Sequence, residues 1–336
     1  MLADLPILAV AVAVVSALLT AGVRRLALAR GVLDVPNERS SHLIPTPRGG
    51  GAAIVVTSTV AFCVLAALGV IDTPLLAALL GGLPVALIGF LDDRRSVRAS
   101  VRLVVHFGAA AWAVWCLGGL PAISGGGQPV ALGGLGNVLG VFLIVWSLNL
   151  FNFMDGIDGL ATSEAIFVAW CGALLEPGAA VPAAAIVLGA ACCGFLFWNR
   201  PPARIFMGDV GSGFLGYVLG VLIVAATRAD PIAPWSWLIL GGVFFIDATA
   251  TLMRRAARGD RVFEAHRSHA YQWLARRWGS HGRVTVTVTL LNCLWLLPLA
   301  YWSSASPARA AWLALAALAP VLILALAAGA GRAETA

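Results

Sequence analysis

With 336 residues, 60% of them hydrophobic and only 11% charged, the chain is not an ordinary soluble domain, which would carry about a quarter charged residues. The net charge of +6 comes from arginine, because the sequence contains no lysine. The arginines flank apolar segments, so we attribute this basic excess to membrane topology and expect no binding of nucleic acid.

Apolar runs of about 20 residues, the length of a membrane-spanning helix, recur along the chain. They predict an all-α fold, a polytopic membrane bundle of about 11 transmembrane helices that forms one domain over residues 1–336. The first run continues into Arg24 and Arg25 without a cleavage site, so we expect it to be retained. The six cysteines lie in apolar runs and are expected to be buried. The predicted spans are 4–23, 51–70, 75–91, 101–120, 132–151, 161–176, 181–198, 210–227, 235–253, 284–304 and 308–329.

Arginine is concentrated in alternate loops between these spans, and only Arg228 and Arg309 fall on the other side. By the positive-inside rule, the N-terminus is predicted on the outer side of the membrane and the C-terminus on its cytoplasmic side. The membrane is expected to be the inner (cytoplasmic) membrane. The same loops hold almost every Asp, His and Asn, although topology requires only arginine. We therefore predict an active site facing the cytoplasm, built from loops 29–50, 92–100, 149–160, 199–213 and 254–283.

The first of these loops contains three prolines, which stiffen it, and ends in Gly49-Gly50-Gly51 before the next predicted helix. A glycine-rich turn at a helix N-terminus can cradle an anion, and an ordinary Pro/Gly loop with basic flanks is the alternative. The segment between 37 and 48 adds Asn37, Glu38, Arg39 and Arg48.

The next such loop opens with the adjacent pair Asp92-Asp93, followed by Arg94 and Arg95. Neighbouring carboxylates repel each other, so the pair is expected beside a cation or as a base with a raised pKa. A solvated charged loop with arginine partners is the alternative.

The stretch from Asn149 to Gly159 places Asn149, Asn152, Asp155 and Asp158 three residues apart at the end of an apolar run. On a continuous helix these side chains would drift round the surface. The glycines at 156 and 159 predict a break in the helix there, which could turn several oxygens toward one ligand. Asp and Asn supply the hard oxygen ligands that Mg²⁺ prefers.

Two further loops carry polar motifs. Asp209 follows Met207-Gly208 at a predicted helix start, where it could bind metal or cap the helix. Phe206 could stack on a base or pack in the core. His266 and His269 would share a face if they lie on a helix, and with Arg267 they resemble a phosphate site more than a zinc site, which would need a third ligand.

One acid lies inside a predicted span. Asp247 is surrounded by apolar residues and is expected to pair with a neighbouring Arg or His.

Five motifs follow one another along the chain: Pro-Thr-Pro-Arg-Gly-Gly-Gly, Asp-Asp, Asn-x-x-Asn-x-x-Asp-Gly-x-Asp-Gly, Phe-Met-Gly-Asp-x-Gly-Ser and His-Arg-Ser-His. With these motifs in this order, the chain resembles the polyprenyl-phosphate N-acetylhexosamine-1-phosphate transferases (glycosyltransferase family 4). That superfamily includes undecaprenyl-phosphate GlcNAc-1-phosphate transferases and phospho-N-acetylmuramoyl-pentapeptide transferase. The resemblance covers about residues 34–277. It implies a membrane enzyme that moves a sugar 1-phosphate from a UDP-N-acetylhexosamine to undecaprenyl phosphate, releases UMP and uses Mg²⁺, for which Mn²⁺ could substitute.

The resemblance also implies roles for individual residues. The paired aspartates would act in catalysis on the lipid phosphate, the 152–158 motif would bind the nucleotide sugar, the 199–209 loop would contact uridine and metal, and the histidines would lie near the pyrophosphate. Catalytic roles are expected for Asp92, Asp93, Asp155, His266 and His269. Substrate contacts are expected for Arg48, Asn152, Asp158, Asn199, Phe206 and Arg267, and metal contacts for Asp209, Asp92 and Asp155.

The sub-type and the alternatives follow from the same motifs. His-x-x-His differs from the run of adjacent histidines usual in the muramoyl-pentapeptide enzymes, so the chain looks more like the branch that initiates O-antigen or related cell-envelope polysaccharides. The lysine frequent in the family is missing, and Arg39, Arg48, Arg94 or Arg95 could replace it. An ion-coupled transporter is the alternative from another class, although no internal repeat is evident. A homodimer is compatible with this assignment.

Overall fold

The computed structural model describes residues 4–36, 44–261 and 266–333. The predictions that concern Asn37, Glu38 and Arg39 therefore lie outside the described residues. The elements, in chain order, are α1 Leu5–Ala29, β1 Leu33–Asp34, β2 Thr46–Pro47, α2 Gly51–Ala67, α3 Thr73–Leu80, α4 Gly82–Asp92, α5 Ala99–Leu117, β3 Ala122–Gly125, β4 Gln128–Ala131, α6 Gly134–Met154, α7 Leu160–Leu175, α8 Ala180–Asn199, α9 Asp209–Ala229, α10 Ala233–Leu240, α11 Gly242–Ala257, α12 Ala270–Trp278, α13 His281–Leu291, the π-helix η2 Asn292–Leu296, α14 Leu297–Ser304, the 3₁₀-helix η3 Pro307–Arg309 and α15 Ala310–Ala328.

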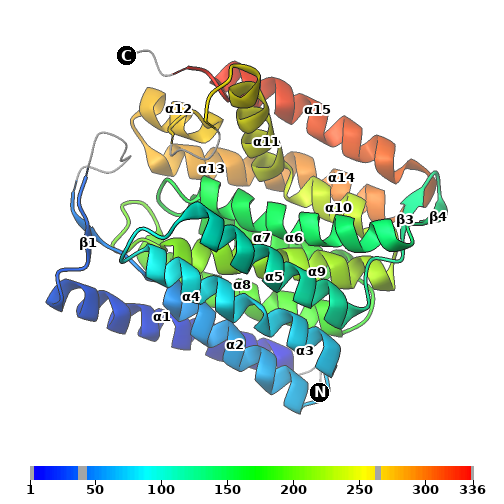
Figure 1. Ribbon diagram of the computed structural model, residues 1–336, viewed down its shortest axis with the longest axis horizontal. Coiled ribbons are helices and arrows are strands. Elements are labelled where there is room, and N and C mark those ends of the chain that lie inside the picture. Colours follow the sequence, from blue (N-terminus) through cyan, green and yellow to red (C-terminus); the bar gives the residue numbers. More distant parts are fainter. Residues whose placement is uncertain (1–3, 37–43, 262–265, 334–336) are drawn as a thin grey trace.

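The helices form a bundle of nearly parallel and antiparallel rods (Figure 1). Each of the eleven predicted apolar segments coincides with helix. Within the described ranges, eight helices or helix pairs are long and apolar enough to cross a membrane, and a ninth is the α10–α11 pair, which is bent by 76°. The helices α2 and α7 are apolar but shorter. The predicted all-α, multi-pass membrane fold is confirmed at this level, with eight or nine candidate spans.

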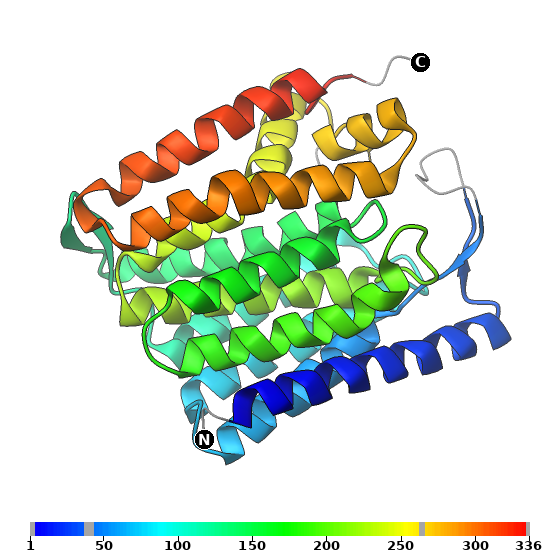
Figure 2. The ribbon, with the colours of Figure 1, turned by 180° about the vertical axis from the view of Figure 1, so that it is seen from behind.

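Helix α9 lies at the centre of the bundle. In its apolar window 94% of the residues are buried, so it is enclosed on all sides, as a helix without a polar face must be. Small residues let its neighbours approach closely: a Cβ on Gly216 would lie 2.6 Å from Leu148 Cα of α6, and one on Gly89 of α4 would lie 2.4 Å from the Asp209 carbonyl oxygen. This packing fixes the position of Asp209 at the first turn of α9. Figure 2 shows the other side of the bundle, where α8 packs between α1 and α7.

Two short hairpins lie at opposite ends of the bundle (Figure 1). Strands β1 and β2 pair antiparallel, with Leu33 opposite Pro47, and β3 pairs with β4, with Ala122 opposite Ala131. Residues 122–131 form a tight β-hairpin. The reason for a hairpin is local, because Gly126 and Gly127 have positive φ angles of 60° and 87°, the conformation that a tight two-residue turn requires.

All five loops with polar motifs emerge at the end of the bundle that carries β1 and α12, which we call the site end (Figure 1). Helix α1 begins toward the opposite end, near α3, and α15 finishes at the site end (Figure 1). The one-sided placement of the motif loops predicted from the sequence is therefore confirmed. The start of α1 and the end of α15 thus lie at opposite ends of the bundle.

Candidate active site

A cavity of about 390 Å³ opens at the site end, between α4, α5, α6, α9 and the start of α12. Its apolar walls come from α4, α5 and α6, and its polar groups come from helices far apart in the sequence. The main polar side chains that line it are Arg102, His106, Asn149, Asn152, Asp155, Asp209, His266, His269, Tyr271 and Gln272. Acidic, cationic and amide groups thus meet in one pocket.

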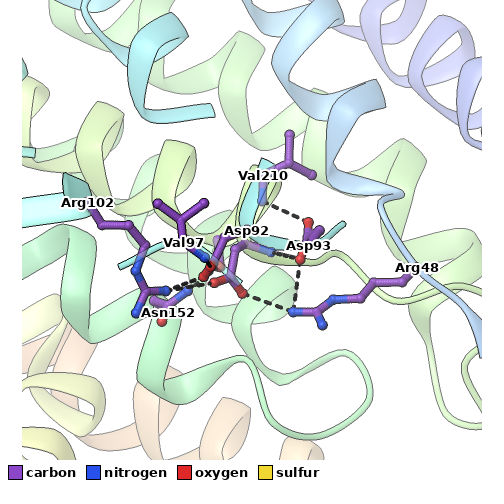
Figure 3. A network of polar contacts seen from close by, with 9 residues as sticks. Arg48, Asp92, Asp93, Val97, Arg102, Asn152 and Val210 are labelled. Atoms are coloured by element: carbon purple, nitrogen blue, oxygen red, sulfur yellow. Dashed lines mark hydrogen bonds and ion pairs between the residues drawn. The ribbon is translucent and has the colours of Figure 1, made fainter. Parts of the chain in front are cut away.

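Asp209 lies between two arginines at one edge of this cavity. Figure 3 shows these arginines, Arg48 and Arg102, on either side of the paired aspartates Asp92 and Asp93. Arg48 Nη2 is 3.1 Å from Asp209 Oδ1 and 2.9 Å from Asp93 Oδ1. Arg102 Nη1 is 3.4 Å from Asp209 Oδ2 and also contacts Asp92 Oδ2. The cation expected beside the paired aspartates is therefore present, and it is arginine on both sides.

The two adjacent aspartates, Asp92 and Asp93, have different hydrogen-bond partners. Asp93 accepts hydrogen bonds from the amides of Asp209 (3.0 Å) and Val210 (3.2 Å), so it caps the N-terminus of α9. Asp92 accepts one from the Val97 amide (2.7 Å) and anchors Arg102. Burial raises the pKa of Asp93, and the guanidinium of Arg48 opposes that rise. Because Asp93 caps the first turn of α9, the carboxylate of Asp209 can instead contact Arg48 and Arg102 at the edge of the cavity.

We expect Asp93→Ala to lower stability more than Asp93→Asn. Loss of a carboxylate cap costs about 1–2 kcal/mol, and the alanine also leaves Arg48 without one of its two carboxylates. Asparagine keeps one acceptor oxygen for the α9 amides. Thermal unfolding of the purified protein in detergent measures the difference. Equal melting temperatures for both variants and the wild type would contradict the capping role.

The predicted helix break at 155–159 is confirmed. Helix α6 ends at Met154, and α7 begins after Gly159, whose φ of +73° is left-handed. Asn152 donates from Nδ2 to Ser212 Oγ at 3.2 Å, and Asp155 follows directly at the cavity wall. Burial raises the pKa of Asp155 well above its usual range, and the nearby carboxylate of Asp209 adds to the rise. A cation bound beside Asp155 would favour its ionised form.

Asp158 turns away from the cavity. Its Oδ2 accepts a hydrogen bond from the Ala203 amide (3.1 Å), and its Oδ1 lies 3.3 Å from His281 Nδ1. Its carbonyl oxygen accepts from Thr285 Oγ1 at 3.0 Å. Asp158 thus ties the break to α13 and to the loop before α9, and this placement favours a structural role over the predicted substrate contact.

Asn199 is 3% exposed and is also hydrogen-bonded within the protein. Its Oδ1 accepts from the Gly159 amide (3.1 Å) and from Thr162 Oγ1 (3.0 Å), and its Nδ2 donates to the Ile205 carbonyl (3.1 Å). These contacts join the end of α8 to the start of α7. They favour a structural role for Asn199 over the predicted contact with uridine.

We therefore expect Asn199→Ala to destabilise the fold. The change leaves the Gly159 amide and the Thr162 hydroxyl buried without this acceptor, and each such group costs about 1–3 kcal/mol. Thermal unfolding in detergent tests the loss, with Thr162→Val as the matched control that removes only one of the two donors. Normal stability combined with weakened binding of the nucleotide sugar would instead support the substrate role.

His266 and His269 both line the cavity, and their ring centroids are 4.9 Å apart. The expectation that they share a helical face is wrong, because α12 begins only at Ala270 and His269 is its N-cap. His266 precedes it in an irregular segment, where its Nδ1 lies 2.9 Å from Ser268 Oγ. The turn at the helix start, not helical periodicity, brings the two imidazoles together.

Three other predicted residues lie outside the cavity lining. Arg48 reaches the site only through Asp93 and Asp209. Phe206 is half-buried, and its backbone bonds to Pro47 and Gly50. The Arg267 carbonyl accepts a hydrogen bond from Arg276 (2.9 Å).

The hydrogen bonds of the glycine-rich turn before α2 favour the ordinary loop over the anion cradle, the two alternatives left open by the sequence. The amides of Gly50 and Gly51 donate to the carbonyls of Phe206 and Met207, each at 2.9 Å, and are therefore not available to an anion. A Cβ on Gly51 would lie 2.4 Å from Gly211 Cα of α9. The glycines thus serve close backbone packing between the start of α2 and the start of α9.

Sequence reasoning missed several cavity residues. Arg102 was counted only as a topological charge, and His106 and Tyr271 were not singled out, although all three line the cavity. Arg102 and His106 are four residues apart on α5, so they share one helical face. That spacing of two basic side chains inside an apolar helix was the available signal.

The donor set suits a hard divalent cation such as Mg²⁺, because carboxylate oxygens of Asp209, Asp92 and Asp155 gather at this edge. Asp92 and Asp209 already share one cationic atom, Arg102 Nη1. Among the described residues, however, no three His, Cys, Asp or Glu side chains are assembled around a common point. A metal ion would fit the chemistry if Arg102 moved toward a phosphate.

Comparison with known proteins gives one matching family and several similar proteins. Residues 75–227 match the family described as glycosyl transferase family 4. A probable undecaprenyl-phosphate N-acetylglucosaminyl 1-phosphate transferase of Bacillus subtilis is 30% identical over 82% of this chain and 78% of its own length. A decaprenyl-phosphate N-acetylglucosaminephosphotransferase of Mycobacterium tuberculosis is 31% identical over 86% and 80%. A phospho-N-acetylmuramoyl-pentapeptide-transferase of a Nostoc species is 33% identical over 62% and 58%.

The matched family segment begins in α3 and ends in α9, so it contains Asp92, Asp93, Asn152, Asp155 and Asp209. The two N-acetylglucosamine-phosphate transferases align with most of their length and most of this chain. The chain therefore belongs to glycosyl transferase family 4, within the superfamily of polyprenyl-phosphate N-acetylhexosamine-1-phosphate transferases, and it is a glycosyl-1-phosphate transferase enzyme.

Proposed function

We propose that the protein transfers an N-acetylhexosamine 1-phosphate from a UDP-sugar to undecaprenyl phosphate and releases UMP. The donor is UDP-GlcNAc or a 6-deoxy relative, and the product starts O-antigen or another cell-envelope polysaccharide. The single observation that carries this proposal is the cavity in which Asp155, Asp209, Arg102 and two histidines meet. It combines metal-binding oxygens with cations, as a diphosphate donor and a phosphate acceptor require.

The reaction joins two anions, so charge crowding is its main barrier and positioned cations are its main requirement. An oxygen of the lipid phosphate attacks the β-phosphorus of the UDP-sugar, the bond to the bridging oxygen breaks, and UMP leaves. Arg102, His266 and His269 lie where they can neutralise phosphate oxygens. Asp155, whose pKa is raised by burial, lines the same cavity and can take the last proton of the lipid phosphate.

Mg²⁺ is the proposed cofactor, and Mn²⁺ could replace it. Asp209 would hold the ion together with Asp92, which shares the contact with Arg102, or with Asp155, which lines the same cavity. Such an ion would neutralise diphosphate charge and stabilise the leaving phosphate. The residues around it would orient the donor: Asn149 and Asn152 supply amide groups on the α6 wall.

We place the site end in the cytoplasm and the protein in the inner membrane. Arginines gather at the site end, as the positive-inside rule requires of a cytoplasmic face, whereas Arg228 and Arg309 lie near the opposite end of the bundle. UDP-sugars are cytosolic, so a cytoplasmic cavity would meet its donor directly. A homodimer is also compatible with the fold and can be tested by light scattering of the purified protein.

Transfer of an acetylated hexosamine is favoured over transfer of a muramoyl pentapeptide. The transferases of B. subtilis and M. tuberculosis align with 82% and 86% of the chain, and the Nostoc muramoyl-pentapeptide enzyme aligns with 62%. The His266-x-x-His269 spacing also differs from a run of adjacent histidines.

The test is UMP release by purified protein supplied with undecaprenyl phosphate, Mg²⁺ and one UDP-sugar at a time. The panel contains UDP-GlcNAc, UDP-linked 6-deoxy-N-acetylhexosamines and UDP-MurNAc-pentapeptide. We expect release only with an acetylhexosamine donor and only when the lipid is present. Release with the pentapeptide alone would establish the muramoyl function, and no release with any of these donors would refute the proposed donor and acceptor.

A further inference from the structure

Asp247 is a buried acid that the proposed chemistry does not use. It lies on α11, the second helix of the bent α10–α11 pair, and 3% of its surface is exposed. An ionisable side chain within a membrane-spanning segment is costly and usually has a functional partner. Its surroundings identify that partner, because both of its oxygens point to one short stretch of chain, residues 269–271.

The carboxylate of Asp247 holds the start of α12. Its Oδ1 accepts from the Ala270 amide (2.8 Å) and its Oδ2 accepts from the Tyr271 amide (3.0 Å). Thr251 Oγ1 donates to Oδ1 from one turn along α11 (3.2 Å). The break between α10 and α11 redirects α11 by 76°, and α11 packs against α12.

The same carboxylate lies beside the imidazole of His269. Asp247 Oδ1 is 3.4 Å from His269 Nδ1, and both side chains are almost fully buried. This distance is longer than a good hydrogen bond, but contacts of this kind often tighten when substrate binds. With Nδ1 facing the carboxylate, Nε2 is the nitrogen left for a ligand in the cavity that His269 lines.

The His269 ring is also held from its faces. Its centroid is 4.9 Å from that of His266, 5.7 Å from that of Tyr271 and 6.1 Å from that of Phe153. The Tyr271 hydroxyl in turn donates to the Phe153 carbonyl (2.9 Å), which connects α12 to the end of α6. Aromatic packing restrains the plane of the imidazole, and Asp247 contacts its edge.

We infer that Asp247 is a positioning residue that orients His269 toward the phosphate groups in the cavity. A buried carboxylate beside one imidazole nitrogen sets the tautomer and fixes the orientation of the ring. Asp247 thus has two linked roles, capping α12 and fixing the histidine at its first position. A purely structural cap would fulfil only the first.

A double-mutant cycle separates the two roles, and this experiment rests on the proposed function. We expect Asp247→Asn to lower kcat for UMP release roughly 10- to 100-fold, with the KM for the UDP-sugar nearly unchanged. In a His269→Ala background the same change is expected to lower kcat by less than about threefold, because the residue through which Asp247 acts is gone. Equal fold losses in both backgrounds would overturn the inference.

The matched control is Asp72→Asn. Asp72 also caps a helix, by accepting from the Leu75 amide at 2.9 Å, but it does so at the end of the bundle away from the cavity. Its replacement is expected to leave kcat unchanged. Asparagine at 247 retains one acceptor oxygen for the α12 amides, so the variant is expected to fold; thermal unfolding in detergent verifies this.

A second readout does not depend on transfer. Diethyl pyrocarbonate modifies neutral imidazole, and peptide mass spectrometry resolves the product at His269 from that at His266. We expect modification of His269 at least about threefold slower in Asp247→Asn than in the wild type, since the carboxylate beside Nδ1 keeps the proton on that nitrogen and leaves the lone pair of Nε2 free to react. An unchanged rate would contradict the inference, even if the wild type releases no UMP and the proposed function fails.

Discussion

Asp209→Asn is expected to lower kcat by about 10³-fold or more, a loss typical when a group that stabilises transition-state charge is removed. Among the residues that the structure describes, Asp209 is the one carboxylate that contacts both arginines and also lines the cavity. Asparagine keeps the shape but loses the charge that holds Arg48, Arg102 and the proposed Mg²⁺. UMP release by purified protein at saturating substrates measures the effect.

Helix α9 offers a matched control. Asp230 is the C-cap of the same helix at its other end, where its Oδ1 accepts from the Ile232 amide at 3.0 Å. Asp230→Asn changes the same functional group on the same helix but far from the cavity, and it is expected to retain full activity. Near-normal activity of Asp209→Asn, with Asp92→Asn equally active, would refute the metal assignment.

The sequence predicted the fold well because the length of each apolar run is the main signal for a membrane-spanning helix. Eleven apolar segments were expected, and helix covers each of them. Each long helix satisfies its own backbone hydrogen bonds, so its position is largely a local property of the chain. The bend between α10 and α11 was not foreseen, because apolar composition continues across it; the adjacent glycines Gly241-Gly242 at the bend were the available signal.

The candidate site was only partly predictable, because neighbouring residues of one type can point to different places. Asp92 and Asp93 are indistinguishable in local sequence, yet Asp93 caps α9 across 116 residues while Asp92 anchors Arg102. Asp155 and Asp158 also differ in where they point. Gly159, which directly follows Asp158, has a left-handed backbone conformation. Asp155 lines the cavity and Asp158 binds the neighbouring loops.

Arginine presents the complementary difficulty. An arginine near a helix start satisfies the positive-inside rule whatever else it does, so Arg102 looked like a topological marker. The structure places it against Asp92 and Asp209. In contrast, Arg94, one of the residues considered as a replacement for the missing lysine, lies over the ring of Phe90 at 4.2 Å. Only long-range packing separates these two outcomes.

Arg102→Met is therefore the second decisive change. We expect kcat to fall about 10²-fold or more, because a cation that would balance transition-state phosphate charge is lost. We also expect the half-saturating Mg²⁺ concentration to fall, since Arg102 occupies Asp92 and Asp209 in the substrate-free protein. Methionine preserves the apolar stem and removes only the charge. UMP release measured over a range of Mg²⁺ concentrations gives both quantities.

Two further variants make the result interpretable. Arg102→Lys keeps a point charge without the planar fork, so it should fall between the wild type and methionine in both kcat and Mg²⁺ dependence. Arg98→Ala removes an exposed arginine one turn earlier, at the N-cap of α5, and is expected to change neither. If Arg102→Met left the Mg²⁺ dependence unchanged while kcat fell, Arg102 would act on substrate alone and would not compete with the metal. If kcat also stayed normal, the arginine would be only a topological charge, and the cationic side of the proposed site would have to be sought in His266 and His269.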